Sequence, residues 1–317
     1  MRVDRYLTPD ELEAALRDDV RRGLASQPKE LPPKWFYDER GSQLFDQITR
    51  LPEYYPTRCE RALLRANAGA IAARAGVDVL VELGSGTSEK TRLLLDALRP
   101  RDYVPFDVDE ATLASSARAL EGEYPGMAVH GVVGDFTCDL GRLPRQGRRL
   151  IAFLGSTIGN LGPDDRAMFL VSLRACVGPG DSLLLGVDLV KDVDRLHAAY
   201  DDEAGVTAEF NRNALRFVNR ELGADFDVDA FEHVARWDAT NRWIEMRLRA
   251  TSPMKVRLET LDLAVAFDEG EELRTEISCK FTPDGIATEL ATAGFDVTDT
   301  WVQGVDDFLL LLATPRE

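Results

Sequence analysis

Short apolar runs alternate with helical segments between residues 77 and 190, and no other feature of the sequence constrains the fold as strongly. Runs such as LIAFLG at 150–155 and SLLLGV at 182–187 are typical of strands that are covered on both faces. Strands that alternate with helices build a doubly wound parallel sheet with right-handed crossovers. The sequence therefore predicts an α/β fold with a Rossmann-like core.

The predicted elements of this core follow one another without a long gap. They are strands at 77–83, 102–109, 127–136, 148–160 and 181–190, and helices at 88–98, 111–124 and 165–177. After Pro283 a helix at 284–295 and two strands, at 296–304 and 308–316, resume the sheet. We expect the last two strands to pair as an antiparallel hairpin that closes it.

The alternation breaks between residues 196 and 281. This stretch first has a helical pattern, at 195–222, and then alternates as strands do, at 231–237, 242–250, 254–267 and 275–281. We interpret it as a second, α+β unit inserted into the first. Ahead of the core, the sequence predicts a helix at 10–25 and an ordered but irregular segment at 31–57, which is rich in proline and aromatic residues.

The balance of charge limits the partners. The chain has 38 Lys and Arg against 55 Asp and Glu, a net charge of −17, so its surface repels a phosphate backbone and we expect no nucleic acid partner. No run reaches the ~20 apolar residues of a membrane span, and the first residues lack the apolar core of a signal peptide. We expect a cytoplasmic monomer with no membrane partner.

The cysteines and histidines form no metal-binding pattern. They are Cys59, Cys138, Cys176, Cys279, His130, His197 and His233. Because no CxxC pair occurs, the cysteines are expected to be free thiols in a reducing compartment. We interpret each histidine as a surface or packing residue, and we expect no metal.

A glycine turn, VELGSGTSEK, joins the first core strand to its helix. Gly84 and Gly86 let the backbone come close to a ligand, and the helix N-terminus favours an anionic group. Asp107 ends the next strand, where a carboxylate can accept both hydroxyls of a ribose. A dinucleotide site would have a third glycine where this chain has Glu89, so NAD and FAD are less favoured.

Asp135 and Phe136 end the third strand of the core. A carboxylate beside an aromatic ring can bond the amino group of an adenine and stack on its ring. The alternative interpretation is that Phe136 belongs to the core and Asp135 caps a loop. Because all of these positions lie at the carboxyl ends of successive strands, where open α/β sheets bind ligands, the pattern favours S-adenosylmethionine.

Several segments resemble the histidine Nα-methyltransferases of ergothioneine biosynthesis, above all the actinobacterial members. They are LPPKWFYDERGSQLFDQITRLPEYYPTR, VELGSGTSEKT, PFDVD, FLGSTIGN, DLVKD, AYDD, GVTAEFNRN and TEISCKF. The resemblance covers nearly the whole chain. It implies a Rossmann-like methyltransferase fold and an enzyme that trimethylates L-histidine to hercynine with S-adenosylmethionine as co-substrate. The sequence departs from the family at ERG before Ser42 and around Trp301 to Asp307.

The resemblance also implies roles for individual residues. The cofactor contacts it implies are Tyr37, Gly84, Lys90, Asp107, Asp135 and Phe136, with Tyr37 as part of a lid. The contacts to histidine that it implies are Tyr54, Asn160, Tyr200, Met246, Glu276 and Ser278. We expect no dedicated catalytic base, because an α-amino group titrates near pH ~8 and is partly neutral in the cell, so the enzyme acts by orienting its substrates.

With the family in view, we expect four segments along the chain. Residues 1–58 are expected to form the N-terminal part of a substrate-binding domain and residues 59–195 a Rossmann-like domain that binds S-adenosylmethionine. Residues 196–281 are expected to be an inserted α+β substrate-binding domain. The helix and strands of 282–317 are expected to complete the Rossmann-like sheet.

The substrate residues also have an interpretation of their own. Glu276 and Ser278 are two apart on a predicted strand, so both side chains point to one face, where they can hold the polar ends of an imidazole. Asn160 and Tyr200 can donate to a carboxylate. Taken singly, Glu276 is equally an edge residue in solvent, Tyr54 a packing ring and Asn160 a turn residue.

Three alternatives stay open beside a histidine methyltransferase. One is a relative that methylates another aromatic amino acid such as tryptophan, and Glu276 argues against it because an indole has no second nitrogen for a carboxylate to hold. Another is a protein that binds S-adenosylmethionine without catalysis. The last is a nucleic-acid methylase, which would carry a [DN]PP[YF] motif where this chain has GSTIGN.

Overall fold

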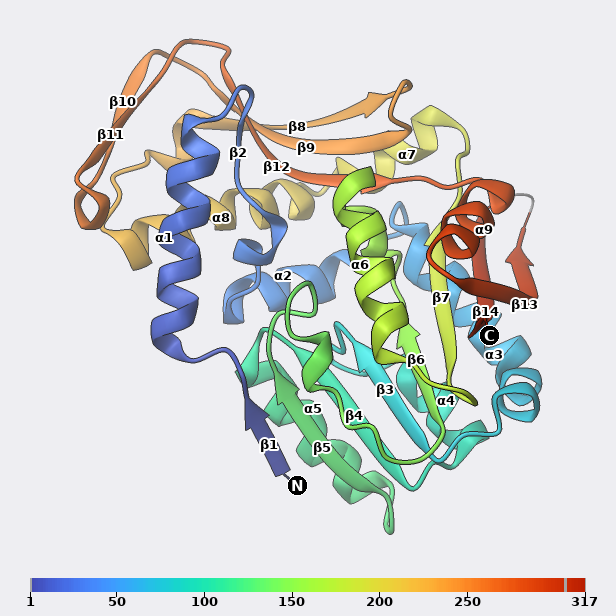
Figure 1. Cartoon of the computed structure of the whole chain (residues 1–317). Helices are drawn as coiled ribbons and strands as arrows, with labels where there is room; N and C mark the ends of the chain where they lie inside the picture. Colours follow the sequence, from blue (N-terminus) through green and yellow to red (C-terminus); the bar gives the residue numbers. More distant parts are fainter. Residues whose placement is uncertain (1, 305–306, 317) are drawn as a thin grey trace. The chain divides into compact units, whose positions relative to one another are not determined.

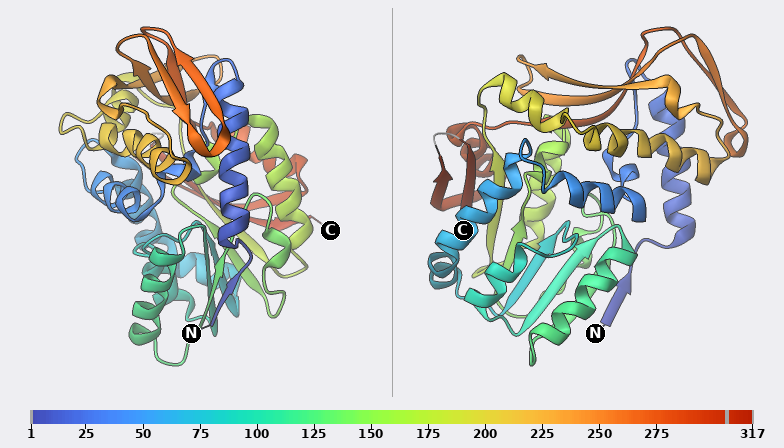
Figure 2. Two further views of the ribbon diagram at one scale, coloured as in Figure 1. Left: turned by 90° about the vertical axis from the view of Figure 1, so that its left-hand side faces the viewer. Right: turned by 180° about the vertical axis from the view of Figure 1, so that it is seen from behind.

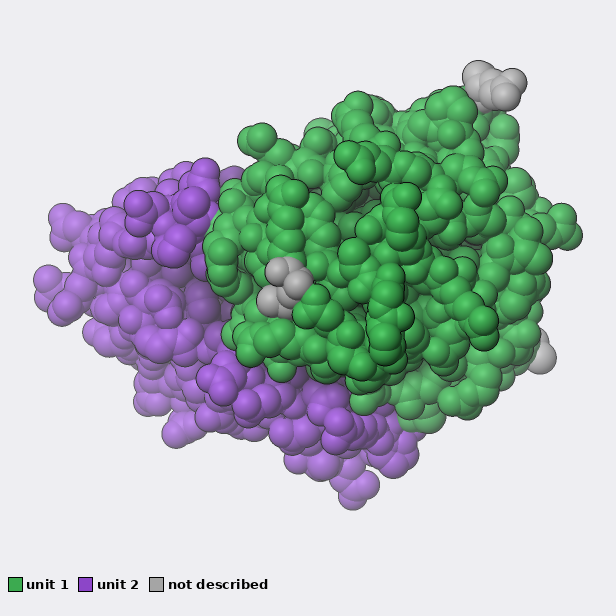
Figure 3. Space-filling model, turned by 90° about the horizontal axis from the view of Figure 1, so that it is seen from below, with its two compact units in different colours: residues 1–7, 56–191, 279–317 green, residues 8–55, 192–278 purple. Residues whose placement is uncertain are grey.

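The structure, a computed structural model, describes residues 2–304 and 307–316 of the chain (Figure 1). The chain divides into two compact units, shown in different colours in Figure 3. Unit 1 comprises residues 1–7, 56–191 and 279–317, and unit 2 comprises residues 8–55 and 192–278. Two segments of the chain therefore leave unit 1 to build unit 2.

The described strands of unit 1 form one sheet. They are β1 (Arg2–Arg5), β3 (Val79–Leu83), β4 (Asp102–Asp107), β5 (Ala128–Val133), β6 (Arg149–Phe153), β7 (Ser182–Asp188), β13 (Phe295–Gln303) and β14 (Phe308–Pro315). Their order is β1-β5-β4-β3-β6-β7-β14-β13. Neighbours from β1 to β7 are parallel, whereas β14 is antiparallel to β7 and β13 is antiparallel to β14.

Helices cover both faces of this sheet. Helices α4 (Thr91–Leu98) and α5 (Glu110–Glu123) lie on one face, and α6 (Pro163–Cys176) lies on the other (Figures 1 and 2). The remaining helices are α3 (Tyr55–Ala75) and α9 (Pro283–Thr292). Residues of β3 are buried along its whole length, as a strand covered on both faces requires. Leu64 of α3, Leu80 of β3 and Leu310 of β14 belong to one apolar core.

This architecture confirms the predicted fold class, a doubly wound α/β sheet of Rossmann-like topology with an α+β insertion. The predicted closing hairpin is present as β13 and β14. Strand β1 was not predicted; it pairs in parallel with β5 from Arg2 to Arg5 and places the first residues in unit 1. Its four residues, RVDR, carry too little apolar character for a pattern to show.

The insertion leaves and rejoins unit 1 at one place, the carboxyl end of β7. Leu189 forms a parallel bridge with Phe281, and the N–H of Val190 donates to the carbonyl of Phe281 at 2.9 Å. The buried carboxylate of Asp188 forms ion pairs with Lys191 at 2.5 Å and Lys280 at 2.9 Å. The outgoing and returning segments are thus joined by backbone pairing and by one shared carboxylate.

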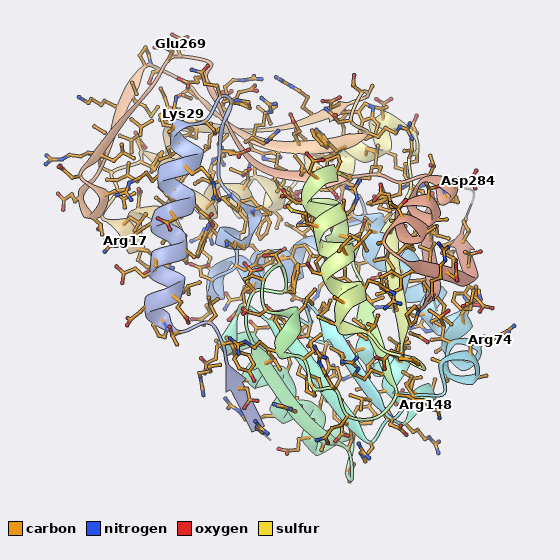
Figure 4. The ribbon with its side chains drawn as sticks, viewed as in Figure 1. Arg17, Lys29, Arg74, Arg148, Glu269 and Asp284 are labelled. Atoms are coloured by element: carbon orange, nitrogen blue, oxygen red, sulfur yellow. The ribbon has the colours of Figure 1, made fainter. Side chains whose placement is uncertain are left out.

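Unit 2 has its own sheet and core. Its strands are β2 (Lys29–Glu30), β8 (Phe231–Asp238), β9 (Trp243–Ala250), β10 (Met254–Leu258), β11 (Leu263–Phe267) and β12 (Glu272–Cys279), and its helices are α1 (Pro9–Ala25), α2 (Glu39–Ile48), α7 (Val193–Tyr200) and α8 (Val206–Leu222). One sheet has the order β2-β12-β9-β8, and β10 and β11 form a separate hairpin. Lys29, labelled in Figure 4, forms an ion pair with Glu271 and has its ammonium 4.7 Å from the ring centroid of Phe267.

Two expectations for unit 2 were wrong. The segment 31–57 is not irregular throughout, because Asp38 caps α2 by accepting the N–H of Gly41 at 2.8 Å. The helical stretch 195–222 is two helices, since the carboxylate of Asp202 accepts the N–H groups of Val206 and Thr207 and starts α8 anew.

Short 3₁₀ turns in both units complete the elements: η1 (Pro33–Phe36), η2 (Leu140–Arg142), η3 (Thr157–Asn160), η4 (Val228–Ala230) and η5 (Glu259–Leu261).

The structure also bears on the expectations about the cysteines and about a membrane span. In the structure none of the four cysteines belongs to a disulfide, which agrees with the prediction of thiols. Within the part of the chain that the structure describes, none of the helices combines the length and the apolar character that crossing a bilayer requires.

Candidate active site

The strand order of unit 1 reverses direction between β3 and β6, which are neighbours in the sheet although α4, β4, α5 and β5 separate them in sequence. In open α/β sheets a ligand binds at the carboxyl ends of the strands beside such a switch point. Gly84 directly follows β3, and η3 follows β6. The glycine turn and the segment that carries Asn160 therefore lie at the position where this topology places a ligand.

The glycine turn has the backbone conformation that its residues predict. Gly84 and Gly86 have φ values of +68° and +47°, in the left-handed region that favours glycine. The N–H of Gly84 donates to the carbonyl of Phe106 at 2.8 Å, which ties the turn to the end of β4. A Cβ on Gly84 would lie 3.9 Å from the ring of Phe136, and one on Gly86 would have no neighbour within 4 Å. Open space beside this backbone suits the close approach of a ligand.

Asp107 links the turn to the next strand. Its Oδ2 accepts the N–H of Gly86 at 2.8 Å, and its Oδ1 accepts the N–H of Asp109 at 3.0 Å. Burial raises the pKa of this carboxyl, and the two backbone donors oppose that shift. Each carboxylate oxygen can accept more than one hydrogen bond, so the predicted contact to ribose hydroxyls is compatible with these bonds.

The structure shows the loop-capping contact of Asp135. Its Oδ1 accepts the backbone N–H of Thr137 at 2.9 Å and the hydroxyl of Thr137 at 2.6 Å. Phe136 is half-buried, and its ring packs edge-on against Phe153 at 5.2 Å and Phe169 at 6.0 Å between centroids. The predicted contact of this pair with an adenine stays a prediction.

Lys90 forms an ion pair that the sequence analysis did not predict. Its partner is Glu60 of α3, whose side chain is wholly buried and whose Oε1 accepts the N–H of Gly155 at 2.7 Å. Gly186 makes room for this carboxylate, because a Cβ there would lie 2.1 Å from Glu60 Oε1. A signal for Glu60 exists in the sequence, since it lies one helical turn before the buried Leu63 and Leu64 and so puts a carboxylate on an apolar face.

A second buried carboxylate, that of Glu82, belongs to a hydrogen-bond network that reaches the glycine turn. Its Oε2 accepts the hydroxyls of Thr91 and Tyr103, each at 2.6 Å, and the hydroxyl of Tyr103 lies 3.0 Å from that of Ser88. Thr91 begins α4 and Ser88 belongs to the turn, so this network joins both to β4. Burial raises the pKa of Glu82 to about 7.

Asn160 lies in η3, which is held by close backbone packing. Ser156 has a φ of +59°, and a Cβ on Gly159 would lie 2.9 Å from the carbonyl oxygen of Cys279. Only glycine fits at that approach without a shift of the backbone. Asn160 itself is half-buried.

The predicted tyrosines of unit 2 lie in one aromatic cluster. Tyr37 and Tyr54 are both in contact with Phe45, at 5.8 and 6.2 Å between ring centroids. Tyr54 is also 6.2 Å from Tyr200, and Phe210 is 5.6 Å from Tyr37. Phe45 and Phe210 were not predicted as members of this cluster, because an apolar ring inside a helix is ordinarily a packing residue.

Tyr200 and Ser278 are hydrogen-bonded to each other, with 2.8 Å between their hydroxyl oxygens. Glu276 and Ser278 both lie on β12, two residues apart, and the orientation of both side chains to one face stays a prediction. Met246 lies on β9 and is buried. Five predicted substrate residues thus belong to unit 2, whereas Asn160 and all the predicted cofactor residues except Tyr37 belong to unit 1.

A family model described as "Histidine-specific methyltransferase, SAM-dependent" matches residues 16–315 of the chain. The chain belongs to this family. Its membership confirms the predicted class of enzyme, a methyltransferase that depends on S-adenosylmethionine.

Across the residues that the structure describes, no three His, Cys, Asp or Glu side chains gather as they would around a metal ion.

Two mycobacterial members of the family are similar to the chain over almost its whole length. The histidine N-alpha-methyltransferase of Mycolicibacterium smegmatis is 59% identical over 312 residues, 97% of each chain. The protein of the same name from Mycobacterium tuberculosis is 58% identical over 315 residues, 98% of each chain. Among solved structures, an S-adenosylmethionine-dependent methyltransferase from Clostridium acetobutylicum matches with a TM-score of 0.51 and 12% identity, covering 88% of this chain and 98% of that one. This last match supports the Rossmann-like methyltransferase fold.

Proposed function

We propose that this histidine-specific methyltransferase transfers three methyl groups from S-adenosylmethionine to the α-amino nitrogen of L-histidine and so makes hercynine, in the first step of ergothioneine biosynthesis. One observation carries the proposal: the chain is 59% identical over 97% of its length to a histidine N-alpha-methyltransferase. We further propose that the enzyme is a cytoplasmic monomer that needs no metal ion. Its net charge of −17 argues against a nucleic acid substrate.

The residues of unit 1 fit S-adenosylmethionine. The open backbone at Gly86 accommodates a closely approaching ligand, and the carboxylate of Asp107 suits the ribose hydroxyls. Asp135 and Phe136 suit the adenine, and the ammonium of Lys90 suits an anionic group such as a carboxylate. When bound, the sulfonium supplies an activated methyl group.

The residues of unit 2 fit histidine. On one face of β12, the carboxylate of Glu276 can accept an imidazole N–H, and the hydroxyl of Ser278 can bond the other ring nitrogen. Tyr200 can donate to the substrate carboxylate, a role also proposed for Asn160 of unit 1, and Met246 is proposed to line the pocket. Unit 2, with its two segments, is thus proposed as the substrate-binding domain and unit 1 as the domain for S-adenosylmethionine.

The work of the protein in this reaction is orientation. Methyl transfer is an in-line displacement, so the amino nitrogen must be held roughly 3 Å from the methyl carbon with the reacting orbitals aligned. An α-amino group titrates near pH ~8, so a sizeable fraction is neutral at cellular pH and no dedicated base is needed. The rings of Tyr37 and Tyr54 can stabilise the methylated cation by about 0.5–2 kcal/mol.

An assay by mass spectrometry tests the proposal. The purified protein is incubated with S-adenosylmethionine and, in separate reactions, each of the twenty amino acids. Histidine is expected to gain roughly 42 mass units, which corresponds to three CH₂ groups, and tryptophan and tyrosine are expected to gain none. A product from tryptophan with none from histidine would overturn the proposal in favour of an enzyme for another aromatic amino acid.

A further inference from the structure

His233 of β8 connects two helices of unit 2 through its imidazole ring. Its Nε2 lies 2.8 Å from the backbone carbonyl oxygen of Tyr200, at the end of α7. Its Nδ1 lies 2.8 Å from the side-chain nitrogen of Asn211 on α8. The side chain is only 2% exposed, so these bonds are not exchanged with water. The proposed chemistry assigns no role to this ring.

The hydrogen-bond partners fix one form of the ring. A carbonyl oxygen only accepts, so Nε2 carries a hydrogen, and the amide nitrogen of Asn211 only donates, so Nδ1 carries none. The orientation of the amide is itself determined, because its nitrogen also donates to the carbonyl of Arg247 at 3.0 Å and its oxygen accepts the hydroxyl of Thr275 at 2.5 Å. His233 is therefore the neutral imidazole with its hydrogen on Nε2.

The lowered pKa of His233 agrees with the neutral form of the ring. Burial lowers the pKa of His233, and the positive charge of Arg212 on α8 lowers it further. The carboxylates of Asp201 and Asp202, which follow α7, act in the opposite direction, and Asp201 Oδ1 lies 3.9 Å from Nε2. The neutral ring donates its Nε2 hydrogen to the carbonyl oxygen of Tyr200.

Tyr200 is consequently held at both ends. Tyr200 is the last residue of α7, and its carbonyl accepts a hydrogen bond from His233. Its hydroxyl bonds to that of Ser278 on β12. A tyrosine fixed at its backbone and at its hydroxyl keeps little freedom to change the position of that hydroxyl.

We infer that His233 is a positioning residue for the amino acid substrate, which it serves by fixing the backbone of Tyr200 and thereby the hydroxyl that binds the substrate carboxylate. This inference rests on the proposed function, in which Tyr200 binds histidine. His233 itself touches neither substrate nor cofactor in this scheme. Its contribution is to the affinity for the amino acid.

Nitrogen NMR of the unaltered enzyme tests the first part. Only three histidines occur, so a protein labelled with ¹⁵N in its imidazole rings gives three pairs of ring signals, and the pair lost in His233→Gln identifies His233. At pH 7 we expect the neutral Nε2–H tautomer. Adding unlabelled L-histidine to the complex with S-adenosylhomocysteine should shift these signals and leave those of His130 unchanged. A hydrogen on Nδ1, or no shift when histidine binds, would contradict the inference.

Steady-state kinetics tests the second part. His233→Phe keeps a ring but removes the donor, so the KM for histidine should rise roughly 3- to 30-fold while kcat changes less than about threefold and the Kd for S-adenosylmethionine stays the same. His233→Gln keeps an N–H that can reach the carbonyl, and it should recover part of the loss. The matched control is His130→Phe, which removes a ring hydrogen-bonded to Asp4 in unit 1 and should leave the KM unchanged.

The outcomes separate this inference from the proposed function. If the unaltered enzyme does not methylate histidine, the proposed function fails. If it does, and both variants at 233 keep a KM within twofold of the parent, the function stands and the positioning role is wrong. An equal loss of affinity for S-adenosylmethionine in His233→Phe would also overturn the role, because it would indicate a general structural defect.

Discussion

The Oδ2 atom of Asp107 accepts the backbone N–H of Gly86 at 2.8 Å, so the carboxylate at the end of β4 holds the centre of the glycine turn. The same carboxylate is the predicted partner of the ribose hydroxyls. In the proposed site, one side chain therefore both shapes the glycine turn and offers the ligand a charged acceptor. Its substitution should affect binding through both routes.

Replacing Asp107 with alanine should weaken the binding of S-adenosylmethionine by about 1–3 kcal/mol, because charge-assisted hydrogen bonds are lost. Isothermal titration calorimetry measures the change. Asp102→Ala is the matched control, since Asp102 lies at the opposite end of the same strand and should leave the affinity unchanged. An unchanged affinity in a folded Asp107→Ala protein would remove Asp107 from the site.

The pair formed by Lys90 and Glu60 leads to a prediction about stability. Lys90→Met leaves the buried carboxylate of Glu60 without its cation, which should lower the free energy of unfolding by about 3–5 kcal/mol. Adding Glu60→Gln should restore most of that loss, because no buried charge then remains. Urea unfolding of the single and double variants gives the comparison. Arg61→Met, which breaks an exposed pair with Glu89, should cost less than about 1 kcal/mol. Equal stabilities of the single and double variants would show that Glu60 does not depend on Lys90.

Glu276 determines the choice between histidine and other aromatic amino acids in the proposed site. Glu276→Ala should raise the KM for histidine roughly 10- to 100-fold and change kcat less, because the imidazole is remote from the reacting nitrogen. Tryptophan should become a poor but measurable substrate, and trimming Met246 as well should improve it. Glu232→Ala, an exposed carboxylate on β8, is the control. Histidine kinetics within twofold of the parent, with no tryptophan turnover, would identify Glu276 as a solvated strand residue.

The raised pKa of Glu82 predicts how stability depends on pH. Its pKa is about 7 in the folded protein and 4.5 for an unperturbed glutamate, so the protonated form is favoured by folding. The stability this gives is complete below pH 4.5 and is lost as the pH rises through about 7. Glu82→Gln keeps an acceptor for Thr91 and Tyr103 but does not titrate. Relative to the parent it should gain up to about 3 kcal/mol between these two pH values. Chemical unfolding at several pH values measures the gain, and a difference independent of pH would contradict the prediction.

The sequence predicted those parts of the fold that a local pattern encodes. Strands β3 and β6 are buried along their whole length because both faces are covered, and the residues that follow them carry the glycine turn and η3. Strand β1 escaped prediction because four residues without an apolar run form a strand only through their partner β5. Local sequence does not contain that information.

The candidate site shows the same division. The left-handed backbone of Gly84 and the position of Asp107 at the end of β4 could be predicted from the local sequence, and their contacts with a cofactor stay a prediction. The partners of Glu60 and His233 could not be predicted, since each lies far away in the sequence: Lys90 for Glu60 and Tyr200 for His233. The expectation that His233 is a packing residue was correct as to its burial but did not reveal its hydrogen bonds.

The insertion is a loop whose two ends are fixed at one point of the sheet. Leu189 pairs with Phe281, and Asp188 forms ion pairs with both Lys191 and Lys280. Doubling the length of a flexible closed loop costs only about 0.6 kcal/mol. The stability of the sheet therefore depends little on the number of residues in the loop. A change in the length of this insertion should therefore cost the sheet of unit 1 little stability.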